Sequence, residues 1–298
     1  MKAVRYTEFG GPEVLSLVDV DVPEPGPGQV RIKVMASGVN PFDWKLRMGF
    51  MPSMVTFPAG TGQDAAGVVT AVGEGVTGVQ VGDHVFGTTG SQSAAAEEAV
   101  LTVFAPKPDA LSWEQAGAAG LGAETALRGL RALGLSAGQT LLIDGASGGV
   151  GLAALQIAVD EGLRVVGTAS PAKHDLIARL GGTPVAYGAG VADRVRDVAP
   201  EGVDGIFQAG GASTDELLTL VDDPAKMVTI VDFGAGAKGV QVSGGGAGQW
   251  DAALPAVIAL AERGHYVLRV GRVFSLDQAG EAQAYSAAGG DGRAVIVP

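Results

Sequence analysis

Seven residues beginning at Gly145 have the types and spacing of a phosphate-binding turn. In order they are Gly145, Ala146, Ser147, Gly148, Gly149, Val150 and Gly151. Glycines let a chain turn tightly and let backbone N–H groups come close to a pyrophosphate. A helix that begins here would add amide donors and a partial positive charge. We therefore expect the backbone from Gly145 to Val150 to bind the phosphates of a dinucleotide.

The predicted elements around this turn support that interpretation. The apolar run at 140–144 predicts a buried strand, and the run at 148–162 predicts a helix. A strand, a glycine turn and a helix in this order form the context that a dinucleotide site requires. The spacing is GxxGxxG rather than GxGxxG, and the chain contains 48 glycines. The alternative is therefore a glycine-rich strand–helix turn without a ligand.

The end of the next predicted strand, at 163–168, bears on which dinucleotide would bind. An NAD site places an acidic residue there, for the ribose hydroxyls. Here Ser170 and Lys173 follow the strand, and Tyr187 ends the strand after it. Hydrogen-bond donors and positive charge suit a 2′-phosphate. Lysine is unfavourable at a helix N-terminus, so a ligand is a reason for its presence, although it could simply be solvated. The pattern favours NADP over NAD.

Composition excludes several other classes of protein. The chain has 298 residues, a formal net charge of −12 and no cysteine. An acidic chain repels phosphate backbones, so we expect no nucleic-acid partner. Without cysteine there is no disulfide, thiol nucleophile, iron–sulfur cluster or Cys-ligated zinc, and we expect no metal site. We find neither a leader-like segment nor an apolar run of about 18 residues, and expect a cytoplasmic protein without membrane contact.

The pattern of predicted elements changes twice along the chain. The first hundred residues alternate short strands with turns, which is typical of a small barrel. Ser112 and Gln115 then form a capping-box pattern, and strands and helices alternate, which predicts a parallel sheet. Strand character returns near residue 267. We expect an α/β fold in which a doubly wound parallel sheet (114–264) is inserted into a β-barrel domain (1–113 and 265–298).

Five longer stretches form a more specific pattern than the glycine turn. They are ASGVNPFDWKLRMG, FPAGTGQDAAGVVTAVGEGVTGVQVGDHVFG, APKPDALSWEQAG, LLIDGASGGVGLAALQIA and VVGTASPAKHDLIARLGG. In content and order they resemble the zinc-free, quinone-oxidoreductase (zeta-crystallin-like) branch of the medium-chain dehydrogenase/reductase superfamily. The resemblance implies a GroES-like catalytic domain with an inserted Rossmann domain, and an active site between the two.

The resemblance also implies an activity, which is hydride transfer from NADPH to a quinone without zinc. An NADPH-dependent enoyl or alkenal double-bond reductase is an alternative. A third is an NADPH-binding sensor with little turnover, because the stretch Gly87–Val103 lacks the family's aromatic segment. The resemblance further implies a homodimer. The small, glycine-rich residues 234–250 would form a lid or an edge at its interface.

Several cofactor contacts follow from matching motifs. The resemblance implies that Asn40 of the GVNP motif lines the nicotinamide ribose and that Thr125 lies near the nicotinamide. It implies that Gly210 and Phe233, which follow the fourth and fifth strands of the inserted domain, lie where the chain passes the nicotinamide. Ser170, Lys173 and Tyr187 match positions that hold the 2′-phosphate in NADPH-using relatives.

Three residues near the start of one short predicted helix are candidates for catalysis. Negative charge that develops on an enolate or phenolate needs a hydrogen-bond donor. Asn40, Lys45 and backbone amides are candidate donors, and Asp43 lies one helical turn from Asn40. The alternatives are that Asn40 only caps the helix before Pro41, and that solvent protonates the product. We expect Asp64 to be a buried structural acid.

Overall fold

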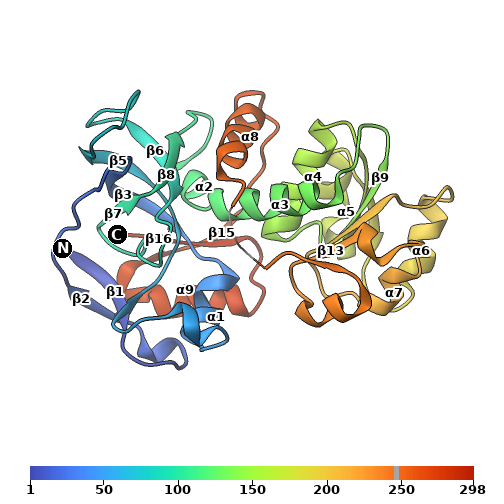
Figure 1. Ribbon diagram of the computed structural model, residues 1–298, viewed down its shortest axis with the longest axis horizontal. Helices are drawn as coiled ribbons and strands as arrows, with labels where there is room; N and C mark the ends of the chain where they lie inside the picture. Colours follow the sequence, from blue (N-terminus) through green and yellow to red (C-terminus); the bar gives the residue numbers. More distant parts are fainter. Residues whose placement is uncertain (245–247) are drawn as a thin grey trace. The chain divides into compact units, whose positions relative to one another are not determined.

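The computed structural model describes residues 1–244 and 248–298, so part of the glycine-rich stretch 234–250 lies outside the described residues. The chain divides into two compact units, each formed from separate segments of the sequence (Figure 1). Unit 1 comprises Met1–Leu121, Val257–Gly264 and Leu268–Pro298, and unit 2 comprises Gly122–Ala256 and His265–Val267.

Unit 1 is built on two sheets. The larger has the strand order β15-β16-β3-β5-β6-β8, with β7 also paired to β3, and the smaller has the order β2-β1-β4. The strands are β1 (Lys2–Tyr6), β2 (Ser16–Asp19), β3 (Val30–Gly38), β4 (Ala59–Gly60), β5 (Asp64–Val72), β6 (His84–Thr88), β7 (Glu98–Leu101), β8 (Val103–Pro106), β15 (Val270–Ser275) and β16 (Arg293–Val297). In β3, the alternate residues Val30, Ile32 and Val34 are buried, as a half-buried strand requires.

Strand pairing in unit 1 places three distant positions near the end of β3. Gly38 pairs with Asp64 of β5 and with Val295 of β16, both antiparallel. Following the β16 register two residues further brings Arg293 opposite Asn40. The chain then enters helix α1 (Pro41–Arg47), for which Asn40 is the N-cap and Pro41 the first residue. The sheet thus assembles side chains that are up to 253 residues apart in sequence.

Unit 2 contains a six-stranded sheet in which every pair of neighbouring strands is parallel. Its order is β11-β10-β9-β12-β13-β14, so the chain changes direction across the sheet between β9 and β12. The strands are β9 (Thr140–Asp144), β10 (Arg164–Ala169), β11 (Thr183–Ala186), β12 (Gly205–Gln208), β13 (Met227–Thr229) and β14 (Gln241–Val242). This is the doubly wound order that the sequence predicts, and ligands of such sheets bind where the order reverses.

Helices account for the remaining regular structure. The α-helices besides α1 are α2 (Trp113–Gly117), α3 (Gly120–Leu133), α4 (Gly149–Asp160), α5 (His174–Arg179), α6 (Val191–Val198), α7 (Thr214–Leu218), α8 (Trp250–Glu262) and α9 (Ala279–Ala287). Short 3-10 helices are η1 (Pro12–Val14), η2 (Pro52–Met54), η3 (Pro171–Lys173), η4 (Pro224–Lys226), η5 (Phe233–Lys238) and η6 (Leu276–Gln278). The predicted Ser112–Gln115 capping box is present at the start of α2.

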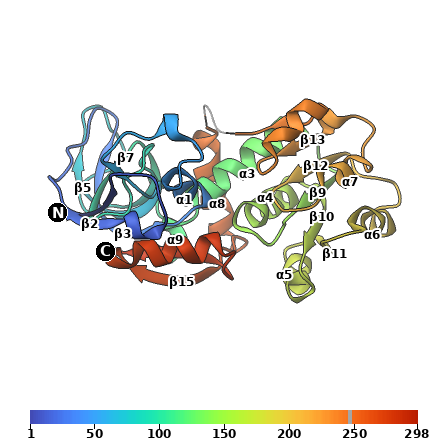
Figure 2. The ribbon, with the colours of Figure 1, turned by 90° about the horizontal axis from the view of Figure 1, so that it is seen from below.

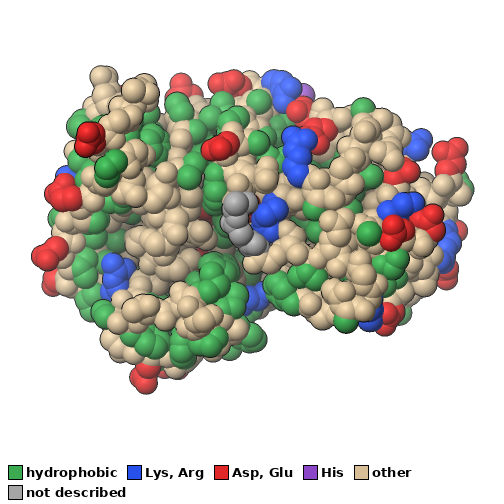
Figure 3. Space-filling view, in the orientation of Figure 1, with side chains coloured by type: hydrophobic (Ala, Val, Ile, Leu, Met, Phe, Trp, Pro, Cys, Tyr) green, Lys and Arg blue, Asp and Glu red, His purple; other side chains and the backbone are tan. Residues whose placement is uncertain are grey.

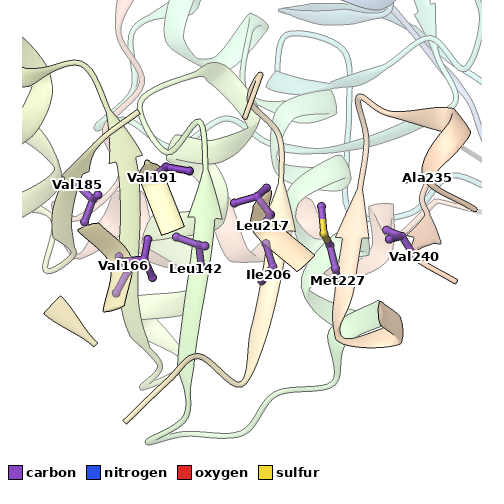
Figure 4. Packing of buried hydrophobic residues seen from close by; sticks show 10 residues of the cluster. Leu142, Val166, Val185, Val191, Ile206, Leu217, Met227, Ala235 and Val240 are labelled. Carbon is purple, nitrogen blue, oxygen red and sulfur yellow. The ribbon is translucent and has the colours of Figure 1, made fainter. Parts of the chain in front are cut away.

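The sheet of unit 2 is covered on both faces. On one face Leu142, Val166 and Ile206 pack with Val191 of α6 and Leu217 of α7 (Figure 4). On the other face α3 approaches so closely that a Cβ at position 129 would lie 2.6 Å from the Phe207 ring. Figure 2 shows α3 and α4 on this second face, opposite α6 and α7. Burial on both faces explains why these strands read as continuous apolar runs.

The surface carries both signs of charge. On the face shown in Figure 3, acidic side chains are interspersed with separate basic ones. Within the described ranges 1–244 and 248–298, no helix combines the length and the apolar character that crossing a membrane requires.

Candidate functional site

The glycine turn lies at the position where the strand order of unit 2 reverses. It connects β9 to α4, and Gly145 has a φ of +80°, which favours glycine over other residues. Gly148 is the N-cap of α4 and provides no side chain to accept hydrogen bonds from the first turn. The first amides of α4 are therefore left uncapped by a side chain, as an anion site at a helix N-terminus requires.

Close backbone packing explains two of the glycines in the turn. A Cβ on Gly145 would lie 2.8 Å from the Cα of Gly210, at the end of β12. A Cβ on Gly151 would overlap the carbonyl oxygen of Gly145. At Gly148 the nearest atom to such a Cβ is this same oxygen, 3.3 Å away, so Gly148 is open on its other side. The structure thus brings Gly145 and the predicted residue Gly210 together.

A buried carboxylate fixes the base of the turn. Asp144 is 1% exposed, and its Oδ1 accepts a hydrogen bond from the Thr168 hydroxyl at 2.6 Å. Its Oδ2 accepts one from the backbone N–H of Ala212 at 3.1 Å. The Thr168 hydroxyl oxygen in turn accepts from the N–H of Gly145 at 2.9 Å. These bonds tie together the ends of β9, β10 and β12 around the glycine turn.

The predicted adenosine-end residues lie at the ends of two neighbouring strands. Ser170 directly follows β10 and Tyr187 directly follows β11, and Ala169 pairs with Ala186 in register. The hydroxyl of Ser170 makes no capping hydrogen bond to the 3-10 helix η3, which ends at Lys173. Tyr187 is 62% exposed. The structure therefore brings these residues to one edge of the sheet, with the Tyr187 side chain open to solvent.

The two remaining cofactor candidates of unit 2 lie on separate elements. Thr125 is half-buried in α3, whose first turn approaches α4: a Cβ on Gly122 would lie 3.5 Å from the carbonyl oxygen of Gly149. Phe233 begins η5, after β13, and is 59% exposed. Phe233 thus lies on the β12 side of the strand-order reversal, and Thr125 lies in the helix that begins next to the glycine turn.

Asn40 lies at the centre of a buried polar cluster in unit 1, which comprises Asn40, Asp43, Asp64 and Arg293. The Nδ2 group of Asn40 donates to Oδ2 of Asp64 at 3.1 Å, and its Oδ1 accepts from the Arg293 guanidinium. These two neighbours determine the orientation of the amide, because arginine can only donate and an ionised carboxylate can only accept. Among residues 1–244 and 248–298, Nδ2 makes one hydrogen bond, which leaves its second hydrogen available.

The carboxyl of Asp43 is buried beside this amide. Asp43 is 2% exposed, and its Oδ2 accepts from the backbone N–H of Asn40 at 2.8 Å. Its Oδ1 has no hydrogen-bond partner among the described residues. Burial, together with a smaller effect of the nearby Asp64 carboxyl, raises the pKa of Asp43 to about 7, although the Asn40 N–H, Arg293 and Gln92 oppose the rise. A carboxyl with this pKa can hold or release a proton near neutral pH.

Lys45 does not join this cluster. Positions 43 and 45 lie on different sides of α1. The Lys45 Nζ atom lies 5.6 Å from the centre of the Trp44 ring, a cation–π arrangement. The structure therefore brings Asn40 and Asp43 together, and it places the third predicted catalytic residue beside an aromatic ring instead.

A cavity of about 490 Å³ opens elsewhere on unit 1. Residues of the Gly87–Val103 stretch, among them Ser91 and Ser93, form part of its wall with Arg5. Gln92, between these two serines, is among the groups that lower the pKa of Asp43. None of the described residues that line this cavity is among the predicted catalytic or cofactor residues.

Comparisons with known proteins establish the family. A crystal structure of an alcohol dehydrogenase superfamily protein from Novosphingobium aromaticivorans has a TM-score of 0.88 and 31% sequence identity. The match covers 100% of this chain and 99% of that one. The chain belongs to the alcohol dehydrogenase superfamily. The superfamily is also called the medium-chain dehydrogenases/reductases, and the expected α/β fold is confirmed.

Two further findings place the chain within the superfamily. Residues 26–126 match the family of the alcohol dehydrogenase GroES-like domain, as the sequence predicts for unit 1. A quinone oxidoreductase of Rattus norvegicus is 44% identical over 174 residues, which are 57% of this chain and 53% of the relative. This similarity agrees with the resemblance to the zinc-free quinone oxidoreductase branch. The chain spans about half the length of such curated relatives.

A relative with a different activity in its name matches a larger share of this chain. The NADPH-dependent alkenal/one oxidoreductase of Arabidopsis thaliana is 33% identical over 248 residues, which are 77% of this chain and 62% of the relative. The match therefore keeps the double-bond reductase alternative open.

Sequence reasoning missed two contributors to the Asn40 cluster. Arg293 is 253 residues from Asn40 and reaches it only through the pairing of β16 with β3. Gln92 lies in the stretch that departs from the family pattern, and its side chain approaches Asp43. No local motif marks either residue. Arg293 stands out in the sequence only as a charged residue at the start of the C-terminal strand, and its partner depends on the register of that strand.

Proposed function

We propose that the protein is an NADPH-dependent oxidoreductase that transfers a hydride to a quinone without zinc. The observation that carries this proposal is the glycine turn, which lies at the strand-order reversal with the N-terminus of α4 uncapped by a side chain. Unit 2 is then the cofactor-binding domain and unit 1 the catalytic domain. Identity to quinone oxidoreductases over 57% of the chain supports the choice of acceptor.

The choice of NADPH is supported by three residues at the adenosine end. Ser170 and Tyr187 offer hydroxyl groups at neighbouring strand ends, and Lys173 adds a positive charge within one turn of Ser170. A 2′-phosphate would accept hydrogen bonds from all three. The Tyr187 side chain is exposed, so its hydroxyl is accessible to a ligand at this edge of the sheet.

The polar cluster of unit 1 supplies a donor for the reaction. The cofactor provides the hydride chemistry, and the protein provides orientation and electrostatics. The second Nδ2 hydrogen of Asn40 would stabilise negative charge that develops on the acceptor oxygen. The Asp43 carboxyl, protonated in part of the population near pH 7, would influence that charge from beneath the amide. Lys45 is the alternative donor.

Reduction of a conjugated carbon–carbon double bond is the second candidate reaction. The observation in its favour is the 33% identity with an alkenal/one oxidoreductase over 77% of this chain. Both reactions use one hydride, and they differ only in whether it is accepted by a quinone or by an alkene carbon.

We also propose a homodimer. Strand β14 is an edge of the parallel sheet of unit 2, and the side chain of Val242 on it is 39% exposed. An exposed edge can pair with the same edge of a second copy. Light scattering would test this directly, and a monomeric mass at micromolar concentration would contradict it.

The decisive experiment is NADPH oxidation by the purified protein, with small quinones and small enones as separate acceptors and NADH in parallel. Quinone turnover with NADPH but little with NADH is the expected result. Turnover of enones alone would replace the quinone proposal with the second candidate. Equal use of NADH would refute the 2′-phosphate assignment, and tight NADPH binding without any turnover would favour a sensor.

A further inference from the structure

A buried ion pair in α3 lies beside the predicted nicotinamide residue Thr125. The Nε of Arg128 donates to Oε1 of Glu124 at 3.0 Å, one helical turn away, and the two side chains are 18% and 5% exposed. The Thr125 hydroxyl lies between them, 3.4 Å from Glu124 Oε2 and 3.5 Å from the Arg128 guanidinium. These longer distances indicate weak bonds, so the hydroxyl is oriented rather than fully engaged.

The same two side chains hold backbone and side-chain groups from a distant segment. Oε1 of Glu124 also accepts a hydrogen bond from the backbone N–H of Gln249 at 3.1 Å. The Arg128 guanidinium donates to the hydroxyl of Ser243, just after β14. The pair therefore connects α3 to Ser243 and to Gln249, both more than 110 residues further along the chain.

Packing alone does not explain why charged residues occupy positions 124 and 128. Removing two charges from water is costly, and apolar residues of similar volume often give equal or greater stability. A charged pair does offer fixed geometry with several simultaneous hydrogen bonds. Besides the bond between them, Glu124 and Arg128 bond to Thr125, Ser243 and Gln249 among the described residues. Helix α3 also begins next to the glycine turn.

We propose that Glu124 and Arg128 are positioning residues for the nicotinamide half of the cofactor site. They hold the Thr125 hydroxyl, Ser243 and the Gln249 amide in one arrangement before the cofactor binds. The adenosine half, which depends on Ser170, Lys173 and Tyr187 of other elements, does not rely on them. This inference rests on the proposed function, because it assumes that NADPH binds to unit 2.

The test separates the two halves of the cofactor. We would measure the Kd of NADPH and of 2′,5′-ADP, which carries only the adenosine half, together with kcat and KM, for wild type and Glu124→Gln. The expected result is NADPH binding weakened about tenfold and kcat reduced, with 2′,5′-ADP binding unchanged within twofold. Asp215→Asn, which breaks the exposed pair with Lys238 in the same unit, is the matched control and should change neither Kd.

Two milder variants cover the case in which Glu124→Gln does not fold. Ser243→Ala removes one contact of Arg128, and Arg128→Lys keeps the charge but cannot bridge Glu124 and Ser243 together. Each should weaken NADPH binding without affecting 2′,5′-ADP. Equal losses for both ligands, or no loss for either, would overturn the inference. If wild type binds 2′,5′-ADP and NADPH equally poorly, the proposed function fails instead.

Discussion

Two polar regions of the molecule satisfy their hydrogen bonds in opposite ways. In the Asn40 cluster of unit 1, the protein itself supplies the partners: Asn40 is 3% exposed and is held by Asp64 and Arg293. At the proposed adenosine end of unit 2, Tyr187 is 62% exposed and the Ser170 hydroxyl makes no capping bond. The side chains of the first region hold one another in place, whereas those of the second would be held by the cofactor that we propose.

This difference determines how each region affects the free energy of unfolding. In the Asn40 cluster, burial raises the pKa of Asp43. The open region keeps its groups solvated and adds little to stability. Substitutions in the first region should therefore change the stability of the fold and its pH dependence, and those in the second should change only ligand affinity.

The largest expected effect is the pH dependence that Asp43 gives to stability. Its pKa is 3.8 in an unfolded chain and about 7 in the fold, so the folded state binds the extra proton between these values. Stability should fall as pH rises from about 4 to 7, by up to about 4 kcal/mol. Asp43→Asn should lack this slope. Urea unfolding of both proteins at pH 5 and pH 8 measures it, and parallel slopes would show that Asp43 ionises normally.

Removing Arg293 should have the next largest effect. Arg293→Met leaves the Asn40 Oδ1 atom without its donor and removes a positive charge that lowers the pKa of Asp43. We expect a loss of about 2–3 kcal/mol of unfolding free energy at pH 8. Arg293→Lys should lose less, because the charge remains. If both variants unfold like wild type, the buried cluster is not held by this residue.

The same contrast explains what the sequence could predict. The proposed cofactor region lies within consecutive strand–helix units, so local spacing was enough to place the glycine turn before a helix and Ser170 and Lys173 after the next strand. Asn40 could be placed from Pro41 and the short helix after it. Its partners Arg293 and Gln92 could not, because they reach it through the pairing of strands and loops whose register no short pattern encodes. The position of Lys45 beside Trp44 likewise depends on a side-chain direction that spacing leaves open.

The glycine turn should respond in affinity rather than in stability. At Gly148 the φ of −76° suits any residue, and an added Cβ meets only the Gly145 oxygen at 3.3 Å. Gly148→Ala should fold normally but weaken NADPH binding about 30-fold, because the methyl group occupies the space of a phosphate. Gly151→Ala, whose Cβ overlaps the Gly145 carbonyl, should instead lower Tm. Calorimetry and fluorescence titration separate the two, and equal losses of Tm would refute the assignment.

Lys173 should affect the choice of cofactor. Lys173→Ala removes a positive charge near the proposed 2′-phosphate, and we expect KM for NADPH to rise about tenfold. KM for NADH should stay within twofold, because NADH lacks that phosphate. The ratio of the two KM values is the measurement. Arg179→Ala, at the other end of α5, is a control that removes the same charge from an exposed position. An equal change in both variants would mean that only overall charge matters.

Tyr187 should show the smallest effect. Tyr187→Phe removes one hydroxyl from a ring that is 62% exposed, so the folded protein loses no internal contact and Tm should not change. Because water competes at so exposed a position, we take the low end of the usual range for a hydrogen bond, about 0.5–1 kcal/mol, which predicts a two- to fivefold weaker binding of 2′,5′-ADP. Adenosine 5′-phosphate, which lacks the 2′-phosphate, should bind both proteins equally. A loss seen equally with both ligands would mean that the hydroxyl binds a group they share, because the ring remains in the variant, and it would refute the assignment of Tyr187 to the 2′-phosphate.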